Sequence, residues 1–346
     1  MIFIKKIIRM TNLIKSAIIT IRDIMKKIVI FGGGTSLSQL LKGFKLFPVD
    51  VTAVVTVADN GKSTGSLRKD YNIPAVGDIS KVLVSMADID DDVRDLLNYR
   101  FEKSESLCPH SIKNLILTAL LDLKGDFNNA LPVMTKLFDV KGSILPLTED
   151  NVDLVALTTD GEKLVGEAEI TNSNSKKERI MYDKDVIINK KVIDSLDEAD
   201  LIIFSAGSLL TSVIPHLLSD ELNEAIRKSK AEKMYICNLF TQPGETDNFT
   251  VSDHVKLLES YLGEDSIDIV VANNDLMNNN LVKKYNCIEQ KDPVKLDTDK
   301  LINMNKKLIL DKLYCIEDDY FRHDSLKTAY LVFSYLMDGK TYDFHN

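Results

Sequence analysis

Residues 26–41 read KKIVIFGGGTSLSQLL, and this stretch decides the fold. The apolar run Ile28–Phe31 is typical of a buried parallel strand. Three glycines follow it, and apolar residues then repeat at helical spacing, namely Leu37, Leu40, Leu41 and Phe44. A strand, a glycine turn and a helix in this order direct backbone N–H groups and the positive end of the helix dipole toward an anion.

The glycine turn is a candidate phosphate site, because a residue without Cβ lets the backbone approach a ligand closely. We expect Gly32, Gly33, Gly34 and Thr35 to contact a phosphate or diphosphate, with Thr35 or Ser36 capping the helix. The dinucleotide pattern G-x-G-x-x-G is absent, since no glycine follows Gly34 at the required spacing. A tight turn without a ligand is the alternative.

Composition limits the class of protein. The chain has 346 residues, of which 45% are hydrophobic, enough for one large α/β domain or two smaller ones. A net charge of −9 and the lack of a basic block argue against a general nucleic-acid binder. The four cysteines are widely spaced without C-x-x-C, which favours reduced thiols in a cytosolic protein, and no H-E-x-x-H pattern supports zinc.

Residues 1–24 differ from the rest of the chain. Basic residues outnumber the single acid, Asp23, and apolar residues fall alternately four and three apart, as on one helix face. Charges interrupt the segment too often for a membrane span or a signal peptide. Three interpretations stand: a membrane-surface helix, a helix packed on the domain, or translated upstream sequence before a natural start at Met25. We therefore expect an extension over 1–24 and a single domain over 25–346.

A second predicted strand, Val49–Val57, ends in another polar loop. Ligands of open parallel sheets lie at the carboxyl ends of strands, so we expect this loop to form a second wall of the site. Its candidate ligand residues are Asp59, Asn60, Lys62, Ser63 and Thr64. Asp59 could orient a sugar hydroxyl, bind a metal ion or act as a base, and Lys62 could neutralise a phosphate; an Asx-turn with solvated charges is the alternative.

Two polar residues lie at predicted helix starts. Asp78 is a natural N-cap, and we favour this structural role over catalysis while keeping it as a candidate ligand residue. Residues 96–139 have a helical pattern and predict a helical subdomain. Asn114 lies near the start of its apolar core, where it either faces the site or caps a helix.

Residues 152–195 predict a small β-rich insertion or an edge extension of the sheet. Val152–Thr158 resembles a strand, and Asp160-Gly161 is a hairpin signal. Leu164–Ile170 alternates like the returning strand, and Ser173–Arg179 is a polar loop.

Three more predicted strands, Asp200–Phe204, Lys233–Leu239 and Ile267–Ala272, end in polar or glycine-containing clusters. The first of these strands is again followed by a glycine turn and the start of a helix. We expect a second anion-binding site there, or an ordinary helix cap. After the second, a Pro-Gly turn could present polar side chains to a ligand. The candidate ligand residues of these two loops are Gly207, Ser208, Thr211, Thr241, Gln242 and Glu245.

Five strand ends of this kind predict one crevice over a Rossmann-like, mostly parallel sheet flanked by helices. The last helix is expected to begin near Asp324, with Arg322 just before it. This arginine is either solvated at the surface or binds a phosphate in a bidentate manner, through two parallel N–H···O bonds.

On these motifs the chain resembles the YvcK-type gluconeogenesis factors, within the wider CofD-like superfamily of 2-phospho-lactate transferases. The resemblance covers about residues 25–338. The stretches that carry it are 32–35, 58–65, 74–79, 207–215, 241–246 and 322–324.

The resemblance implies a Rossmann-like fold and a cytoplasmic protein that controls cell-wall precursor supply and cell shape. It implies binding of a UDP-sugar, with UDP-N-acetylglucosamine favoured. Arg322 resembles the family's ligand arginine, Tyr285 a nearby aromatic that stacks on the ligand, and Ser325 a phosphorylation site. We further expect a protein partner in cell-wall synthesis and a homodimer, with no nucleic acid and no transmembrane segment.

The chain departs from the family pattern in its ligand loops. Ser36 replaces the glycine after Gly-Gly-Gly-Thr, and Lys62 replaces the second glycine of Asp-Asn-Gly-Gly. Ser80 replaces the basic residue after Gly-Asp-Ile, and Lys81 stands next to it. The other departures are Ser205-Ala206 for Gly-Pro and Asp275 for the glycine of Asn-Asn-Gly. All of these changes lie in the predicted ligand loops.

Two hypotheses of function follow. The first is a regulatory protein that binds a UDP-sugar without turnover and acts through a protein partner. The second is a Mg²⁺-dependent transferase that moves a phospho-lactyl-type group from a nucleoside diphosphate to an acceptor phosphate. In that case Asp59 would be catalytic or would hold the metal, and Lys62 would stabilise developing phosphate charge.

Overall fold

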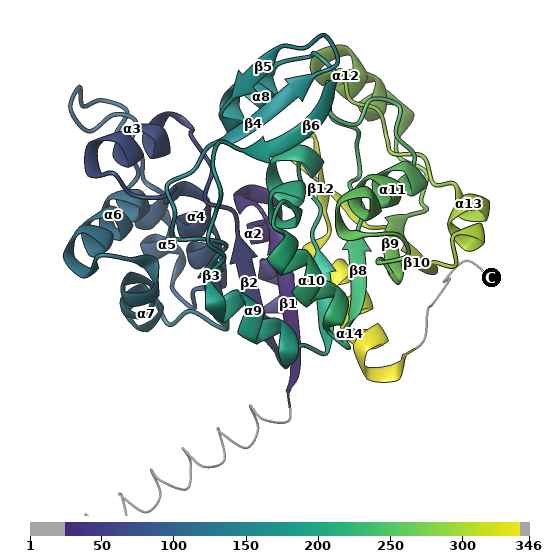
Figure 1. Cartoon of the computed structure of the whole chain (residues 1–346), viewed down its shortest axis with the longest axis horizontal. Helices are drawn as coiled ribbons and strands as arrows, with labels where there is room; N and C mark the ends of the chain where they lie inside the picture. The colour runs from purple at the N-terminus through teal and green to yellow at the C-terminus, as the bar shows by residue number, and fades with distance from the viewer. Residues whose placement is uncertain (1–24, 340–346) are drawn as a thin grey trace, which may run out of the picture.

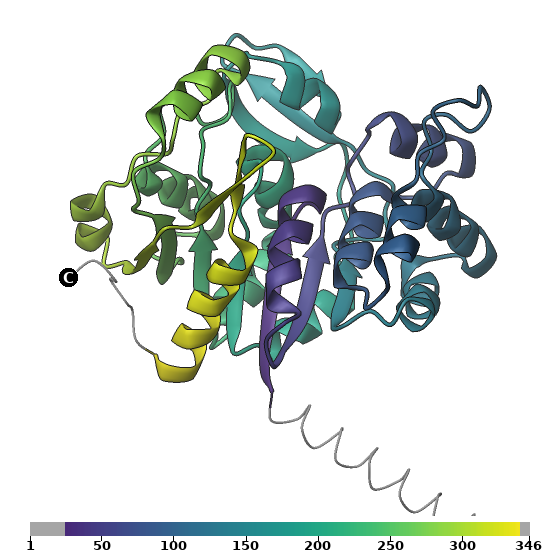
Figure 2. The same ribbon diagram turned by 180° about the vertical axis from the view of Figure 1, so that it is seen from behind.

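The computed structural model describes residues 25–339 and contains a seven-stranded sheet (Figures 1 and 2). The strand order is β10-β9-β8-β7-β1-β2-β3, and every neighbouring pair is parallel. Its strands are β1 (Lys26–Gly32), β2 (Val49–Val55), β3 (Ser143–Pro146), β7 (Leu201–Phe204), β8 (Glu232–Ile236), β9 (Ile269–Asn273) and β10 (Lys307–Asp311). The predicted Rossmann-like α/β fold is confirmed. The predicted extension over residues 1–24 lies outside the described residues.

Strand β1 shows why the sequence forms this sheet. Ile28 and Ile30 belong to the core on one face, whereas Val29 and Phe31 belong to the core on the other. All four side chains are at most 2% exposed. A strand covered on both faces needs a continuous apolar run, which is the pattern of a parallel sheet with helices on each side.

Helices cover both faces of the sheet. One core contains apolar side chains of α2 (Gly34–Phe44), α4 (Gly77–Met86), α6 (Ile112–Lys124), α7 (Phe127–Leu137) and α14 (Ser325–Asp338). The other contains those of α9 (Lys190–Asp197), α10 (Asp220–Lys228) and α11 (Val251–Leu262), together with the insertion. Figure 2 shows α2 and α14 side by side on the first face. In residues 25–339, no helix combines the length and the apolar character that crossing a membrane requires.

The predicted helical subdomain forms one end of the molecule. The predicted range 96–139 contains α6 and α7. In the structure these two helices form a group with α3 (Lys62–Tyr71), α4 and α5 (Asp91–Asn98), which Figure 1 shows on the β3 side of the sheet. Later in the chain, α12 (Asn279–Glu289) and α13 (Thr298–Asn303) lie between β9 and β10, and the hairpin of β11 (Tyr314–Glu317) and β12 (Tyr320–His323) follows β10.

The β-rich insertion is a separate three-stranded antiparallel sheet with the order β5-β4-β6. Its strands are β4 (Leu154–Thr158), β5 (Lys163–Val165) and β6 (Lys177–Tyr182). The predicted strand over Leu164–Ile170 is wrong beyond residue 165, because Gly166 has φ +96° and helix α8 (Glu167–Asn172) follows it. The predicted polar loop Ser173–Arg179 runs into β6 at Lys177.

Two predicted helix caps are also wrong. Helix α2 begins at Gly34 with Gly33 as its N-cap, so Thr35 and Ser36 lie inside the first turn. Helix α4 begins at Gly77 after Val76, so Asp78 lies in the first turn rather than at the cap. Each helix begins two or three residues earlier than the polar side chains suggested. At α14 the cap is Asp324, whose side chain accepts the backbone N–H of Lys327, as expected.

The strand order reverses at β1, because β2 and β3 extend to one side and β7 to β10 to the other. At such a switch point the loops after neighbouring strands diverge and leave a crevice at their carboxyl ends. In Figure 1 the insertion and α12 lie above this end of the sheet.

Candidate functional site

A cavity of about 640 Å³ opens at the carboxyl ends of β1, β7 and β8. Its volume falls within the range of small-molecule sites, about 300–1,000 Å³. Seven of the predicted ligand residues line it: Thr35, Gly207, Ser208, Thr241, Gln242, Tyr285 and Arg322. They come from α2, from the loops after β7 and β8, from α12 and from β12, so residues far apart in the sequence meet at one rim.

Aromatic rings form one wall of this cavity. The ring of Tyr285 stacks on Phe240 with 4.8 Å between centroids and 26° between planes. The Tyr285 hydroxyl accepts the backbone N–H of Phe321 at 2.8 Å, which fixes α12 against β12. Arg322 is exposed beside this wall and lies 5.3 Å from the ring centroid of Tyr320. The wall thus offers flat apolar surface and a cation next to each other.

The three glycines are required by close packing. A Cβ on Gly32 would lie 2.1 Å from the Ser205 hydroxyl oxygen, and one on Gly33 would lie 2.5 Å from the Ser212 hydroxyl oxygen. A Cβ on Gly34 would lie 2.1 Å from an oxygen of Asp78. These contacts leave no room for a side chain. The turn therefore brings the backbone against Ser205 and Ser212, which follow β7, and against the first turn of α4.

The loops after β7 and β8 are joined beneath the cavity. Asn238 bonds Gly207 twice, accepting its N–H at 2.8 Å and donating to its carbonyl oxygen at 2.7 Å. The Ser208 hydroxyl donates to the carboxylate of Glu245 and accepts the N–H of Thr211 at 3.1 Å. Burial raises the pKa of Glu245, and the bond from Ser208 opposes this shift. Ser208, Thr211 and Glu245 thus form one network that sets the shape of the second glycine turn.

Asp59 holds its own loop together. Its carboxylate accepts the backbone N–H of Gly61 at 2.8 Å and the hydroxyl of Thr64 at 2.9 Å. This is the Asx-turn named above as the alternative for this loop. Behind it, Asn114 donates to the Ser63 hydroxyl at 3.1 Å and accepts from Ser80 at 2.6 Å. Asn114 is therefore a buried member of the loop's support, while Lys62 and Asn60 lie nearer the surface.

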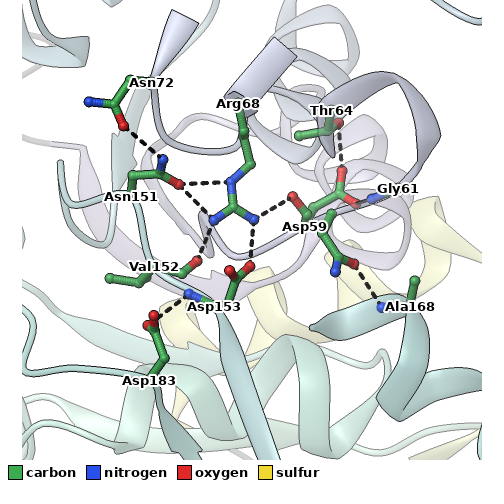
Figure 3. A network of polar contacts seen from close by, with 11 residues as sticks. Asp59, Gly61, Thr64, Arg68, Asn72, Asn151, Val152, Asp153, Ala168 and Asp183 are labelled. Atoms are coloured by element: carbon green, nitrogen blue, oxygen red, sulfur yellow. Dashed lines mark hydrogen bonds and ion pairs between the residues drawn. The ribbon is translucent and has the colours of Figure 1, made fainter. Parts of the chain in front are cut away.

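Arg68 ties this loop to the insertion (Figure 3). Its guanidinium donates to the side-chain oxygen of Asn151 at 2.9 and 2.7 Å and forms an ion pair with Asp153 at 2.9 Å. It also donates to the carbonyl oxygens of Val152 and Asp59, at 2.8 and 3.4 Å. One buried arginine thus fixes the segment that enters the insertion relative to the Asp59 loop.

Three carboxyl groups from separate elements lie near the glycine turn. The buried side chain of Asp78 bonds Lys81 at 3.1 Å, and burial raises its pKa against the opposing effect of Lys81. Burial and then Asp78 and Asp59 raise the pKa of Glu167 to about 8. Glu167 is therefore mostly protonated at neutral pH. The same carboxylates raise the pKa of Lys81, outweighing the effect of burial.

The family model described as 2-phospho-L-lactate transferase CofD matches residues 28–314. The chain belongs to the CofD family. It is 41% identical over 313 residues to a Bacillus subtilis protein named gluconeogenesis factor, a match that covers 90% of this chain and 98% of that one. It is 40% identical to a putative gluconeogenesis factor of Thermotoga maritima, over 88% and 98% of the two chains. The predicted resemblance is confirmed.

A solved structure shows the same fold. A crystal structure of a Bacillus halodurans protein matches with a TM-score of 0.86 and 37% identity, over 89% of this chain and 99% of that chain. A second crystal structure of the same protein, described there as a member of the UPF0052 family, matches with a TM-score of 0.84.

In this CofD-family chain the predicted ligand residues form two groups. The first lines the cavity, and the second surrounds Asp59, with members Asn60, Lys62, Ser63, Thr64 and Asn114. Gly32, Gly33, Gly34, Asp78, Thr211 and Glu245 are not among the residues that line the cavity. The cavity opens at three of the five strand ends, so a single crevice over all five stays a prediction.

Several lining residues were missed by sequence reasoning, namely Gln39, Asn238, Phe240, Lys291, Tyr320, Phe321 and His323. Asn238 and Phe240 directly follow β8, so the position rule that selected Thr241 could also have selected them. Lys291 and Tyr320 carry no such signal, because the fold of α12 and the β11–β12 hairpin brings them to the cavity.

The site offers few side chains that could bind a resident metal ion. Among residues 25–339, no group of three or more His, Cys, Asp or Glu side chains is arranged to hold one. Mg²⁺ that arrives with a nucleotide needs only one or two carboxylates, because the substrate phosphates and water complete its shell. Asp59 and Asp78 are the side chains near the glycine turn that could supply them.

Proposed function

We propose that this protein is a regulatory binder of a UDP-sugar, with UDP-N-acetylglucosamine as the favoured ligand. The observation that carries the proposal is the convergence, in one cavity at the switch point of the sheet, of the first turn of α2, the turn at Gly207, an aromatic wall and an exposed arginine.

The cavity matches the parts of a UDP-sugar. Phe240 and the ring edge of Tyr285 offer surface on which a uracil ring can stack. The helix α2 begins at the rim with Thr35 and Ser36, where backbone N–H groups and hydroxyls attract a diphosphate. Arg322 can bond two phosphate oxygens at once. Gln242 and Thr241 supply the neutral donors and acceptors that sugar hydroxyls need.

The names of the relatives support one part of the proposed biological role. Relatives named gluconeogenesis factor support a role in growth on gluconeogenic carbon sources. We assign to this chain a cytoplasmic location and control of cell-wall synthesis and cell shape through a protein partner, acting as a homodimer. Ser325 begins helix α14, and a phosphate there would gain from the helix dipole, so we keep it as the proposed modification site.

Calorimetry with UDP-N-acetylglucosamine tests the proposal. We expect saturable binding, with weaker binding of UDP because the sugar contacts are lost. Uridine without phosphate should bind weakest of the three. Absence of measurable heat with millimolar UDP-N-acetylglucosamine, together with no ligand-induced change in thermal unfolding, would overturn the proposal.

A second function is kept because a specific observation favours it. The matching family model is described as a transferase, and Asp59 and Asp78 lie beside the glycine turn. In a Mg²⁺-dependent transferase these residues would position the metal or the acceptor, and Lys62 would stabilise charge on the phosphate. Release of a nucleoside monophosphate from a nucleotide-linked donor, dependent on Mg²⁺ and on Asp59, would establish this alternative in place of the regulatory binder.

A further inference from the structure

An ion pair lies next to the aromatic wall of the cavity. Glu289 and Lys291 both line the cavity, and the Lys291 ammonium donates to the Oε2 atom of Glu289 at 2.7 Å. Their side chains are 30% and 35% exposed, so the pair is partly withdrawn from solvent. Among the described residues that line the cavity, Glu289 is the only one with a carboxylate.

Glu289 follows Tyr285 by one helical turn. Both residues belong to α12, and residues four apart lie on the same face of a helix. Burial raises the pKa of Tyr285, and Glu289 adds to this shift whereas Arg322 opposes it. The carboxylate and the guanidinium therefore both lie near the Tyr285 side chain. A ligand ring packed on the wall of Phe240 and Tyr285 would have the carboxylate beside it.

The chain after α12 is anchored so that Lys291 returns to the cavity. The carbonyl oxygen of Asp292 accepts the N–H of Thr241 at 2.7 Å, and the N–H of Asp292 donates to the Thr241 hydroxyl at 3.0 Å. Pro293 pairs with Phe240 in an antiparallel bridge. These backbone contacts hold the segment beside the loop after β8, whatever side chain residue 291 carries.

The position of this carboxylate is unfavourable for helix stability. Glu289 is the last residue of α12, where the negative end of the helix dipole disfavours an acid. Lys291 bonds only one of its oxygens, and the Oε1 atom accepts no hydrogen bond from the part of the protein that the structure describes. An ion pair of this exposure contributes little to stability. Binding therefore explains the pair better than stability does.

A carboxylate oxygen only accepts hydrogen bonds, so its ligand partner must be a donor. In dinucleotide-binding sheets an acid accepts a hydrogen bond from the ribose hydroxyl. Asp59 follows β2, but both of its oxygens accept bonds within its own loop. Glu289 is thus the acid that remains for a ribose next to a base stacked on the aromatic wall.

We propose that Glu289 accepts hydrogen bonds from the ribose hydroxyls of a nucleotide bound in the cavity, and that Lys291 orients the carboxylate. Glu289 is a specificity-determining residue, which selects a nucleotide with a ribose diol over one without it. Lys291 is a positioning residue that acts through Glu289. The inference rests on the proposed function in that the ligand is a nucleotide, but it does not depend on which base the nucleotide carries.

Calorimetry of the full chain with UDP and 2′,3′-dideoxy-UDP tests the role of Glu289. We expect the unaltered protein to bind UDP at least about tenfold more tightly, the effect of one hydrogen bond to a charged group. Glu289→Ala should remove this preference. Glu221→Ala is the matched control and should keep it, because Glu221 is exposed on α10 and does not line the cavity.

Thermal unfolding should show that Glu289→Ala is folded, because the change removes an acid from a helix C-terminus. A preference for UDP that is the same in Glu289→Ala, or that is missing from the unaltered protein, would overturn the inference.

Two variants of Lys291 test its positioning role. Lys291→Met leaves the carboxylate without its donor and should reduce the preference for UDP over the dideoxy form. Lys291→Arg can still donate to Glu289 and should retain the preference. A general loss of packing would weaken the binding of both nucleotides equally, so the ratio of the two affinities isolates the effect on the ribose. An unchanged ratio in Lys291→Met would overturn the role of this lysine.

Other nucleotides separate this inference from the proposed function. If Glu289→Ala alters the preference for UDP over CDP but not for UDP over the dideoxy form, the carboxylate bonds the base and the inference is wrong. If UDP-N-acetylglucosamine and UDP do not bind but GDP or ADP does, the proposed ligand is refuted, and the dideoxy form of that nucleotide tests Glu289 in the same way. If no nucleoside diphosphate binds, both proposals are refuted.

Discussion

The hydroxyl of Ser208 lies 2.9 and 2.8 Å from the two carboxylate oxygens of Glu245 and donates to that group. This contact joins the loop after β7 to the loop after β8 beneath the cavity. Glu245 is 8% exposed, so its charge depends on the donors that surround it. The pair stabilises the second glycine turn, at Gly207, through these hydrogen bonds.

Replacement of this carboxylate should destabilise the fold. We expect Glu245→Ala to lower the free energy of unfolding by about 1–3 kcal/mol, because Ser208 and the Leu210 N–H lose a buried acceptor. Glu245→Gln, which keeps one oxygen, should cost less. Urea denaturation at pH 7 measures both, with Glu178→Ala on the exposed face of β6 as control. Equal stability of Glu245→Ala and the unaltered protein would refute this role.

Glu167 should make stability depend on pH. Its folded-state pKa is raised to about 8 from an ordinary value of 4.5, so the folded protein holds a proton that the unfolded chain releases between these values. Stability from this group is full below about pH 4.5 and is lost as pH rises through 8. We expect Glu167→Gln to reduce the fall in unfolding free energy between pH 5.5 and 8.5 by about 1–2 kcal/mol. If the unfolding free energies of Glu167→Gln and the unaltered protein changed with pH by the same amount, the raised pKa of Glu167 would be contradicted.

Arg68 should control the attachment of the insertion. Its side chain is 8% exposed and bonds Asn151, Val152 and Asp153 at the start of that segment. We expect Arg68→Ala to cost about 3 kcal/mol of stability and to speed hydrogen exchange in β4 and β6 more than in β1. Lys69→Ala, at the neighbouring exposed position, should change neither. If hydrogen exchange became faster by the same factor over the whole chain, the substitution would have loosened the whole fold rather than the insertion.

Gly34 should tolerate no side chain. In Gly34→Ala the new methyl carbon would lie 2.1 Å from an Asp78 oxygen and 2.9 Å from the Asp78 Cα, so the turn or α4 must shift. We expect a loss of about 1–3 kcal/mol in unfolding free energy. Gly61→Ala is the comparison, because its methyl carbon would meet only one side-chain oxygen, at 3.1 Å. A Gly34→Ala protein as stable as Gly61→Ala would refute the close approach.

The strands of the central sheet were predictable where apolar runs were long. Residues 28–31, 49–57, 200–204, 233–239 and 267–272 all contain the strand cores that the structure shows. Strand β3 escaped prediction because it has only four residues and ends in Pro146. Strand β10 and the hairpin of β11 and β12 were also missed, since short runs near polar turns carry little periodic signal.

The candidate site was predictable as a set of loops but not as a set of contacts. The rule that ligand residues follow the ends of parallel strands correctly predicted that Thr35, Gly207 and Gln242 lie at one rim. The sequence could not show that both oxygens of Asp59 accept bonds within its own loop, because that depends on how the chain turns before α3. Nor could it bring Glu167, from the insertion, toward Asp59 and Asp78, since only tertiary packing does so.

The measurement that tests the account most directly is the dissociation constant of UDP-N-acetylglucosamine for the full chain and for Arg322→Ala. The account predicts saturable binding that Arg322→Ala weakens by about 1.5–3 kcal/mol, the range for a charged hydrogen bond, while Arg179→Ala on exposed β6 leaves it unchanged. Equal affinity of the Arg322→Ala variant and the unaltered protein would contradict a diphosphate held at this cavity.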